Sequence, residues 1–401
     1  MATALQLNLT SGEVRQAPRG IPAAFLLREA AGALGDIGTF VPLAVGMVQI
    51  AGLDAGTLLV TAGLVNIWGG LAFRIPIAVQ PMKAICALAI AGALSGTQAV
   101  AAGLSVGVCM AVLGLFGLVR TLARLVPTAV LRGLQLTVAV ELLRRGLQFA
   151  FPGSLTSLVA SPAGAIPLIL TSGGLLALWS LRHRLEWAAI GLAVAGLGIA
   201  AWREPSLMTA AHVSLWRPHL MSFDLAALEG IWRGGLPQVP LTLLNSVFAV
   251  AALAAQLYPQ HAERITPTRM ALSVGIMNMI VCPLGGMPLC HGSGGLAGQH
   301  KLGARSGVSV VMLGAAKLTL GLLFGGMALA WMRAFPQPVL GLFLLLAGWS
   351  LAEASRASAT RAGIWVSLAM VGAYYSSGLL LLAFAVGWLV CWFVQRGEAG
   401  R

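Results

Sequence analysis

The chain has two short polar interruptions in its apolar sequence, and their residue types suit the binding of an anion. The first reads Gln80, Pro81, Met82, Lys83, and the second reads His291, Gly292, Ser293, Gly294, Gly295. A helix that begins inside a membrane leaves its first backbone N–H groups unpaired and turns the positive end of its dipole toward the cavity. Two such ends facing each other predict an anion-binding site.

The side chains at both interruptions add hydrogen-bond donors to these backbone groups. Gln80 can donate through its amide and Ser293 through its hydroxyl, and glycines such as Gly292 let the backbone approach an oxyanion closely. Proline suits the first turn of a helix, so Pro81 predicts that a half-helix begins here. Two alternatives stay open. The glycine cluster could be a helix-packing patch, and His291 could either titrate or act as a neutral hydrogen-bonding residue.

Two lysines lie in apolar stretches where a charge is costly. A lysine at the centre of a membrane helix costs about 2.5–3.5 kcal/mol on insertion scales, which makes Lys83 a candidate for function. It could complement a bound dianion or extend to the membrane interface. Lys317, in VVMLGAAKLTLGLLFGG, could bind substrate or pair with Glu353 or another buried acid.

Two carboxylates are candidates for coupling transport to protons. Asp36 lies in LGDIGTFVP, a segment broken by glycine and proline, and Gln238 takes the corresponding place in LPQVPLTLLN. An ionised carboxylate is repelled by a nearby dianion and a protonated one is not, so Asp36 predicts joint binding of proton and anion. Asp36 could instead cap a half-helix or pair with Lys83. Glu353, near the end of a span, is the second candidate, whereas Glu141 is expected to pair with neighbouring arginines.

The composition excludes most other classes of protein. Of 401 residues, 58% are hydrophobic and only 9% are charged, whereas soluble domains carry roughly 25% charged residues. This excludes a soluble enzyme and a nucleic-acid-binding protein, and it makes the lipid bilayer the expected surroundings. The five cysteines form no CxxC pair and no Cys/His metal spacing, so neither a metal site nor a cofactor is expected.

Apolar segments that could cross a bilayer recur along the chain. About fourteen spans are predicted, at 30–50, 55–73, 77–94, 98–119, 126–146, 162–180, 186–202, 236–256, 270–285, 289–300, 306–330, 337–353, 361–374 and 376–395. Most Lys and Arg residues between the spans fall on one side, which predicts that both termini are cytoplasmic. This assignment puts Arg144 and Arg145 on the outside. The excess of arginine over lysine indicates a bacterial source, and hence the inner membrane.

The clearest sign of organisation is an internal repeat. GLVNIWGGLAFRIP at 63–76 matches GIMNMIVCPLGGMP at 275–288, so Gly63, Asn66 and Pro76 each recur 212 residues later. With seven spans in each half, the second half is inverted relative to the first, as in secondary transporters whose substrate site lies at helix breaks near mid-membrane. We therefore predict an all-α polytopic membrane protein. Its predicted parts are a cytoplasmic tail at 1–25, a first repeat at 26–202, a linker at 203–235, a second repeat at 236–395 and a tail at 396–401.

The same segments carry a resemblance to a known family. LGDIGTFVPL, VQPMKAICA, LPQVPLTLLNSV and PLCHGSGGLAGQHKLGARSG together resemble the molybdate-transporter branch of the sulfate permease superfamily, over about residues 25–395. The resemblance implies a seven-plus-seven inverted repeat with a core domain and a gate domain, and it implies molybdate as the substrate. This branch generally lacks the regulatory domain of sulfate permeases, so a homodimer would form through the membrane part.

The sequence as a whole predicts a secondary active transporter that imports molybdate, coupled to protons, by alternating access. A transporter of sulfate or another small oxyanion stays open, because molybdate and sulfate share charge and shape. A passive anion channel is the alternative from another class, and it would need no titratable coupling residue. An enzyme is not expected, because the sequence has neither a clustered His/Asp metal motif nor a convincing Ser–His–acid set.

Overall fold

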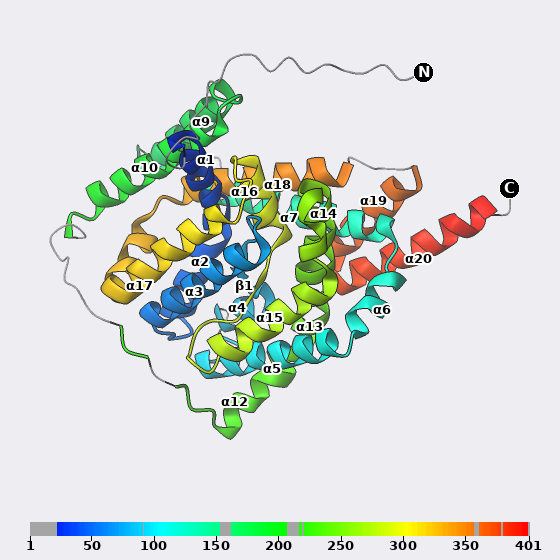
Figure 1. The fold of residues 1–401 in the computed structure, drawn as a ribbon. Coiled ribbons are helices and arrows are strands. Elements are labelled where there is room, and N and C mark those ends of the chain that lie inside the picture. The colour runs from blue at the N-terminus through cyan, green and yellow to red at the C-terminus, as the bar shows by residue number, and fades with distance from the viewer. Residues whose placement is uncertain are drawn as a thin grey trace, which may run out of the picture.

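The computed structural model describes residues 22–90, 92–152, 162–206, 216–218, 220–356, 361–377 and 380–399. Within these ranges the chain is almost entirely helical, with one pair of short strands inside the bundle (Figure 1). The first half comprises α1 (Ala23–Ala33), η1 (Leu34–Asp36), α2 (Ile37–Gln49), α3 (Ala55–Phe73), β1 (Val79–Pro81), α4 (Lys83–Ile90), α5 (Gly96–Leu115), α6 (Leu118–Leu125), α7 (Thr128–Ala150), α9 (Pro162–Ser180) and α10 (Leu185–Arg203). The second comprises α12 (Leu225–Gly230), η2 (Ile231–Gly235), α13 (Leu236–Leu241), η3 (Thr242–Ala249), α14 (Val250–Leu257), η4 (Pro259–Arg264), α15 (Pro267–Val281), β2 (Leu289–His291), α16 (Ser293–Lys301), α17 (Val308–Ala334), α18 (Gln337–Arg356), α19 (Arg361–Ser377) and α20 (Leu380–Ala399).

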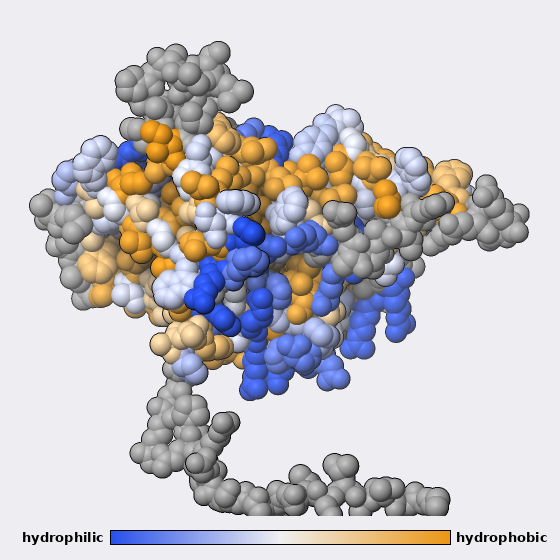
Figure 2. All heavy atoms as spheres, turned by 90° about the horizontal axis from the view of Figure 1, so that it is seen from above, coloured by the Kyte–Doolittle hydropathy of each residue, from blue (hydrophilic) through white to orange (hydrophobic). Residues whose placement is uncertain are grey.

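Large apolar side chains lie on the outside of this bundle. Leu71 and Phe116, for example, are 67% and 76% exposed. Figure 2 shows apolar residues over much of one face, with hydrophilic residues gathered in part of it. An apolar surface of this extent is suited to contact with lipid rather than with water.

Among the described residues, five helical stretches are long and apolar enough to cross a membrane, namely Ala23–Gln49, Ala55–Phe73, Gly96–Leu115, Leu225–Leu257 and Val308–Gly325. A sixth is the pair Met327–Ala334 and Gln337–Glu353, which is bent by 77°. The protein is therefore a mainly helical, multi-pass membrane protein. Each of the fourteen predicted segments contains a helix, and the number of spans stays a prediction.

Both polar interruptions of the sequence fold into a short strand followed by a half-helix. β1 leads into α4, and β2 leads into α16. The strands pair antiparallel in the register Val79–His291, Gln80–Cys290 and Pro81–Leu289. This pairing supplies the backbone hydrogen bonds that an unwound segment needs away from water. It also brings the starts of α4 and α16 together in the middle of the fold.

We call the strand pair, together with the starts of α4 and α16, the crossing. Further hydrogen bonds hold the crossing in place. The amide of Asn278, on α15, donates to the carbonyl of Leu289 at 2.6 Å and accepts from the N–H of Leu289 at 2.9 Å. The N–H of Met82 donates to the carbonyl of Pro288 at 2.9 Å. Each interruption is thus attached to a segment of the other half or to the helix that precedes it.

Equivalent residues of the sequence repeat make reciprocal contacts between the halves. α3 packs against α17, and α15 packs against α5. A Cβ added to Gly314 on α17 would lie 2.6 Å from the carbonyl oxygen of Gly63, and one added to Gly107 on α5 would lie 3.2 Å from that of Gly275. Glycine at these points lets the helix backbones approach closely, and the same offset of 212 residues relates Gly63 to Gly275.

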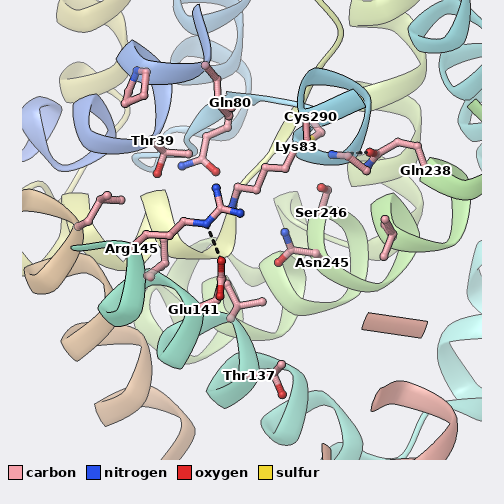
Figure 3. Close-up of a pocket in the computed structure, with 18 of the residues that line it drawn as sticks. Thr39, Gln80, Lys83, Thr137, Glu141, Arg145, Gln238, Asn245, Ser246 and Cys290 are labelled. Atoms are coloured by element: carbon pink, nitrogen blue, oxygen red, sulfur yellow. Dashed lines mark hydrogen bonds and ion pairs between the residues drawn. The ribbon is translucent and has the colours of Figure 1, made fainter. Parts of the chain in front are cut away.

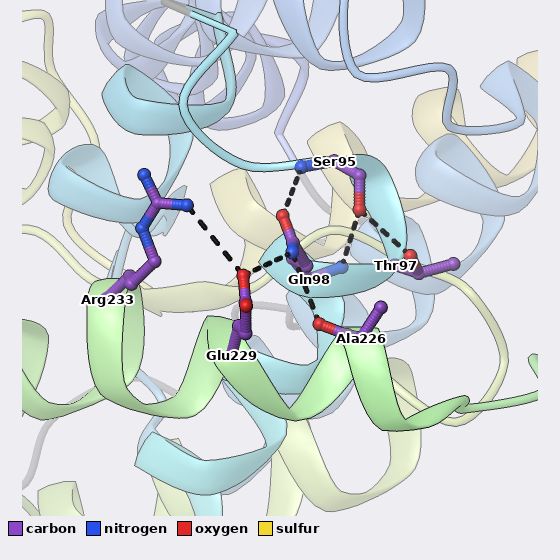
Figure 4. Close-up of polar contacts among 6 residues, drawn as sticks. All are labelled: Ser95, Thr97, Gln98, Ala226, Glu229 and Arg233. Carbon is purple, nitrogen blue, oxygen red and sulfur yellow. Dashed lines mark hydrogen bonds and ion pairs between the residues drawn. The ribbon is translucent and has the colours of Figure 1, made fainter.

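The helical stretch Leu225–Leu257 begins inside the predicted linker 203–235 and is attached to the start of α5. There, the hydroxyl of Ser95 accepts from the N–H of Gln98 at 3.2 Å, and Oε1 of Gln98 accepts from the N–H of Ser95 at 2.9 Å (Figure 4). The amide of Gln98 also donates to the carbonyl of Ala226 at 3.2 Å. This reciprocal cap therefore fixes both the start of α5 and the position of α12.

Candidate functional site

A cavity of about 540 Å³ lies beside the strand pair, among α2, the start of α4, α7, and the stretch formed by α13 and η3. Its polar lining includes Thr39, Gln80, Lys83, Thr137, Glu141, Arg145, Gln238, Asn245, Ser246 and Cys290 (Figure 3). Apolar side chains such as Leu43 and Phe149 form much of the rest. An apolar cavity with a few converging polar groups is the usual form of a ligand site.

β1 contributes Gln80 and the start of α4 contributes Lys83, and both line the cavity. Gln238 reaches it from α13, where its Oε1 accepts a hydrogen bond from the N–H of Ala84 at 3.2 Å. Its Nε2 donates to the hydroxyl of Thr242 at 3.1 Å. Gln238 therefore caps the first turn of α4 from the other half of the chain.

Asp36 takes the corresponding place beside the start of α16. Its side chain is fully buried, and its Oδ1 accepts a hydrogen bond from Nε2 of Gln80. A Cβ added to Gly295, in the first turn of α16, would lie 2.6 Å from this Oδ1. Among the described residues, Oδ2 of Asp36 and Oε1 of Gln80 have no hydrogen-bond partner. Asp36 lies behind the cavity lining, and Gln80 connects the two.

Lys317 lies in the same buried region as Asp36. Its ammonium donates to Oδ1 of Asn66 at 2.9 Å and stands 3.5 Å from the centre of the Phe40 ring. Within the described ranges, no ion pair joins Asp36 to Lys83. The pairing of Asp36 with Lys83 that the sequence left open is therefore not found in this structure.

Glu353, the second coupling candidate, is placed outside the cavity. Its side chain is 51% exposed and accepts from Lys301 at 2.8 Å and from the indole of Trp349 at 2.8 Å. Lys317 thus has no pairing with Glu353, contrary to one alternative from the sequence. The placement leaves Asp36 as the candidate that is connected to the cavity, through Gln80.

The second interruption reaches the cavity through an intermediate residue. The hydroxyl of Ser293 donates to Oδ1 of Asn245 at 3.0 Å, and Asn245 lines the cavity. His291 is fully buried, with one ring nitrogen 2.7 Å from the hydroxyl of Ser273 and the other 3.1 Å from the carbonyl of Ala78. Since both nitrogens are engaged away from the cavity, His291 is a hydrogen-bonding residue behind the site, the second of its two alternatives.

The remaining predicted site residues shape the crossing rather than line the cavity. Pro81 belongs to β1, and Met82 is fully buried beside it. A Cβ added to Gly292 would lie 1.9 Å from Oε1 of Gln80, and one added to Gly294 would lie 2.4 Å from a leucine side chain. Gly292 therefore allows close packing against Gln80, and Gly294 allows close packing against Leu142.

Two charged residues of α7 were missed as site residues. Glu141 and Arg145 line the cavity, whereas the sequence assignment put Arg144 and Arg145 on the outside. Both arginines lie within α7, which continues to Ala150, so Arg145 belongs among the residues of the site. As expected, Glu141 pairs with both arginines. The i, i+4 spacing of Thr137, Glu141 and Arg145 is the signal that could have placed them on one helix face.

Comparison with solved structures identifies the class of fold. The chain superposes on the transmembrane domain of the cyanobacterial bicarbonate transporter BicA with a TM-score of 0.56 and 14% identity, covering 92% of this chain and 98% of BicA's. It superposes on the murine anion transporter Slc26a9 in its inward-facing state with a TM-score of 0.59 and 13% identity, covering 98% and 74%. The fold is that of the SLC26-type membrane transporters, and with the relatives described next it defines an anion transporter rather than an enzyme.

Sequence comparison identifies the family. The family model described as "Molybdate transporter of MFS superfamily" matches residues 28–142 and 230–351. Molybdate transporter 2 of Arabidopsis thaliana is 34% identical, covering 90% of this chain and 86% of that protein. Molybdate transporter 1 of Chlamydomonas reinhardtii is 36% identical, covering 82% and 83%. The chain belongs to the molybdate transporter family.

Proposed function

We propose that the protein is a secondary active transporter that imports molybdate together with protons by alternating access. The observation that carries this proposal is the strand pair, which brings the starts of two half-helices together beside a cavity lined by Gln80 and Lys83. Molybdate is a tetrahedral dianion, so it is suited to helix N-termini, an amide donor and a lysine ammonium. The named relatives support this choice of substrate.

The contact between Asp36 and Gln80 suggests how a proton controls the site. When Asp36 is ionised, it accepts from the amide N–H of Gln80, so this amide cannot donate the same hydrogen to an anion. When Asp36 is protonated, its hydroxyl can donate to Oε1 of Gln80, which has no partner among the described residues. The amide group of Gln80 can then turn its NH₂ toward the cavity.

Other charges around Asp36 set the strength of this coupling. Lys317 from α17 and Lys83 from α4 both interact with it electrostatically. These cations favour the ionised carboxylate, and a bound dianion opposes it. Because proton and molybdate act on one group, each should raise the affinity for the other.

The coupling is tested by molybdate uptake into proteoliposomes at different external pH values. We expect uptake by the wild type to rise as external pH falls from neutral toward 5.5. Asp36→Asn should bind molybdate but lose most of this pH dependence, because its NH₂ can donate to Gln80 as the protonated acid does. If Asp36 were only structural, the variant would instead lose stability, by about 1.5–3 kcal/mol for the weakened hydrogen bond between a charged group and Gln80. A stable variant with the wild-type pH profile would contradict the proposal.

The reciprocal contacts of the halves support the predicted inverted repeat. We propose seven spans in each of 26–202 and 236–395, joined by 203–235, with core and gate domains and with both termini cytoplasmic, as expected for a bacterial inner membrane. Single cysteines introduced at the two termini, labelled from one side of sealed vesicles, test the orientation. Labelling of the two ends from opposite sides would exclude an even number of spans. Light scattering of the purified protein tests whether a homodimer forms.

Competition and current measurements separate the proposal from its alternatives. Excess sulfate that abolishes uptake of labelled molybdate would make the protein a general transporter of tetrahedral dianions. An anion current that persists without any gradient of protons would make it a channel. We expect molybdate uptake that resists a tenfold excess of sulfate and that stops when the proton gradient is collapsed.

A further inference from the structure

Arg145 enters the cavity from the side opposite Lys83. Lys83 begins α4, next to the strand pair, whereas Arg145 lies in the last third of α7. Both line the cavity, and Figure 3 shows their charged groups pointing toward each other in the same space. The two cations interact electrostatically. Like charges repel when the space between them holds no anion, so the arrangement calls for a negative group between them.

Glu141 holds Arg145 in this position. The Nε of Arg145 donates to Oε1 of Glu141 at 2.5 Å. Arg144 occupies the same carboxylate with two hydrogen bonds, from Nε to Oε2 at 2.9 Å and from Nη2 to Oε1 at 2.8 Å. Among the described residues, Arg145 makes this single hydrogen bond through Nε, which leaves the two terminal amino groups of its guanidinium for a ligand.

We propose that Arg145 is a second cation for the substrate dianion, supplied across the cavity by α7 and kept in place by Glu141. The charges support this role. Lys83 and Arg145 both line the cavity, and their two positive charges match the two negative charges of the anion. The guanidinium is a planar fork that can bind two oxygens of one oxyanion.

The inference rests on the proposed function and adds a mechanical consequence. An anion held by Lys83 and Arg145 connects α4 to α7. The bound dianion would therefore draw the two sides of the cavity together, whereas an empty cavity leaves two cations that repel. Substrate itself would favour the closed form, and only a ligand that contacts both sides can do this.

The test compares Arg145→Gln with Arg144→Gln in purified protein, by calorimetric titration with molybdate. The two arginines are adjacent, both bind Glu141, and their side chains are similarly exposed, at 47% and 43%. Only Arg145 lines the cavity. We expect Arg145→Gln to weaken molybdate binding at least tenfold, Arg145→Lys to restore part of it, and Arg144→Gln to change it less than threefold. Equal losses in the two glutamine variants would overturn the inference.

A second titration separates a charge contact from a structural effect. Perrhenate has the shape of molybdate but a single negative charge. One cation interacts about twice as strongly with a dianion as with a monoanion at the same distance, so a 100-fold loss for molybdate should accompany about a 10-fold loss for perrhenate. A purely structural role would weaken both equally, and that result would also overturn the inference. The protein could also fail to bind molybdate but bind sulfate. If Arg145→Gln then weakens sulfate binding 100-fold and perrhenate binding about 10-fold, the role of Arg145 is upheld and molybdate is rejected as the substrate.

Discussion

Gly292 offers a test of whether the Gln80 amide binds the substrate. In Gly292→Ala, the new Cβ would lie 1.9 Å from Oε1 of Gln80 and 2.3 Å from its Cδ, and the third of its nearest atoms also belongs to Gln80. The backbone of Gly292 has φ −121° and ψ 120°, a conformation open to alanine. The clash is therefore confined to one side chain.

The size of the effect follows from the displacement that this clash requires. An ordinary contact needs at least 3.4 Å, so the Gln80 amide must move by about 1.5 Å, which is enough to break a hydrogen bond. A hydrogen bond to a charged group is worth about 1.5–3 kcal/mol, which corresponds to about a 10- to 100-fold loss of molybdate affinity. Gln80→Ala removes the same donor and should cause a similar loss.

The double variant Gly292→Ala/Gln80→Ala provides the decisive measurement. Alanine at position 80 removes the atoms that the new Cβ would meet, so the double variant should bind molybdate as well as Gln80→Ala alone. Contacting residues are expected to be non-additive in this way. Calorimetric titration gives the affinities, and Gly191→Ala, where an added Cβ meets nothing within 4 Å, is the control. If the affinity losses of the two single variants multiply in the double variant, Gly292 acts independently of Gln80, and this result would refute the reasoning.

Three further outcomes follow from the contacts around the cavity. Ser293→Ala should weaken molybdate binding less than Gln80→Ala does, because Ser293 acts through Asn245, and an equal or larger loss in titration would place its hydroxyl on the anion. Alkylation of Cys290, which lines the cavity, should slow when molybdate is present, as measured by mass spectrometry, and unprotected labelling would argue against binding here. Glu353→Gln should keep the wild-type pH profile of uptake, because the exposed ion pair between Glu353 and Lys301 contributes only about 0–1 kcal/mol to stability. A flattened profile would instead make Glu353 the coupling acid.

The position of the crossing could be predicted from the sequence because backbone chemistry determines it. Gly63 and Gly275 mark two copies of one segment, and each copy leads into an apolar run interrupted by polar residues. An unwound segment in a membrane must find hydrogen bonds inside the protein, and the other copy is the available partner. The observed pair Val79–His291 is separated by the same 212 residues as the repeat.

Side-chain direction could not be predicted in the same way. Arg144 and Arg145 are identical residues at adjacent positions, and successive residues of a helix point about 100° apart. Which of the two faces the cavity depends on how α7 packs against α18 and α19, and the local sequence does not contain this information. His291 was ambiguous for a related reason, because its role depends on Ser273, which lies on α15.

The two half-helix ends each follow a short strand but have different partners, and the proposed proton control rests on this difference. The start of α4 is capped by Gln238, a neutral amide that accepts from Ala84 at any pH. The start of α16 lies against Asp36, a carboxylate that can be charged or neutral. In the proposed mechanism, an ionised Asp36 would partly cancel the positive end of the α16 dipole and hold the amide of Gln80, so both contributions to anion binding would depend on one proton. A second carboxylate in place of Gln238 would put both ends under proton control, whereas under the proposal the present pair leaves α4 as a permanent anion-binding end and makes α16 the conditional one.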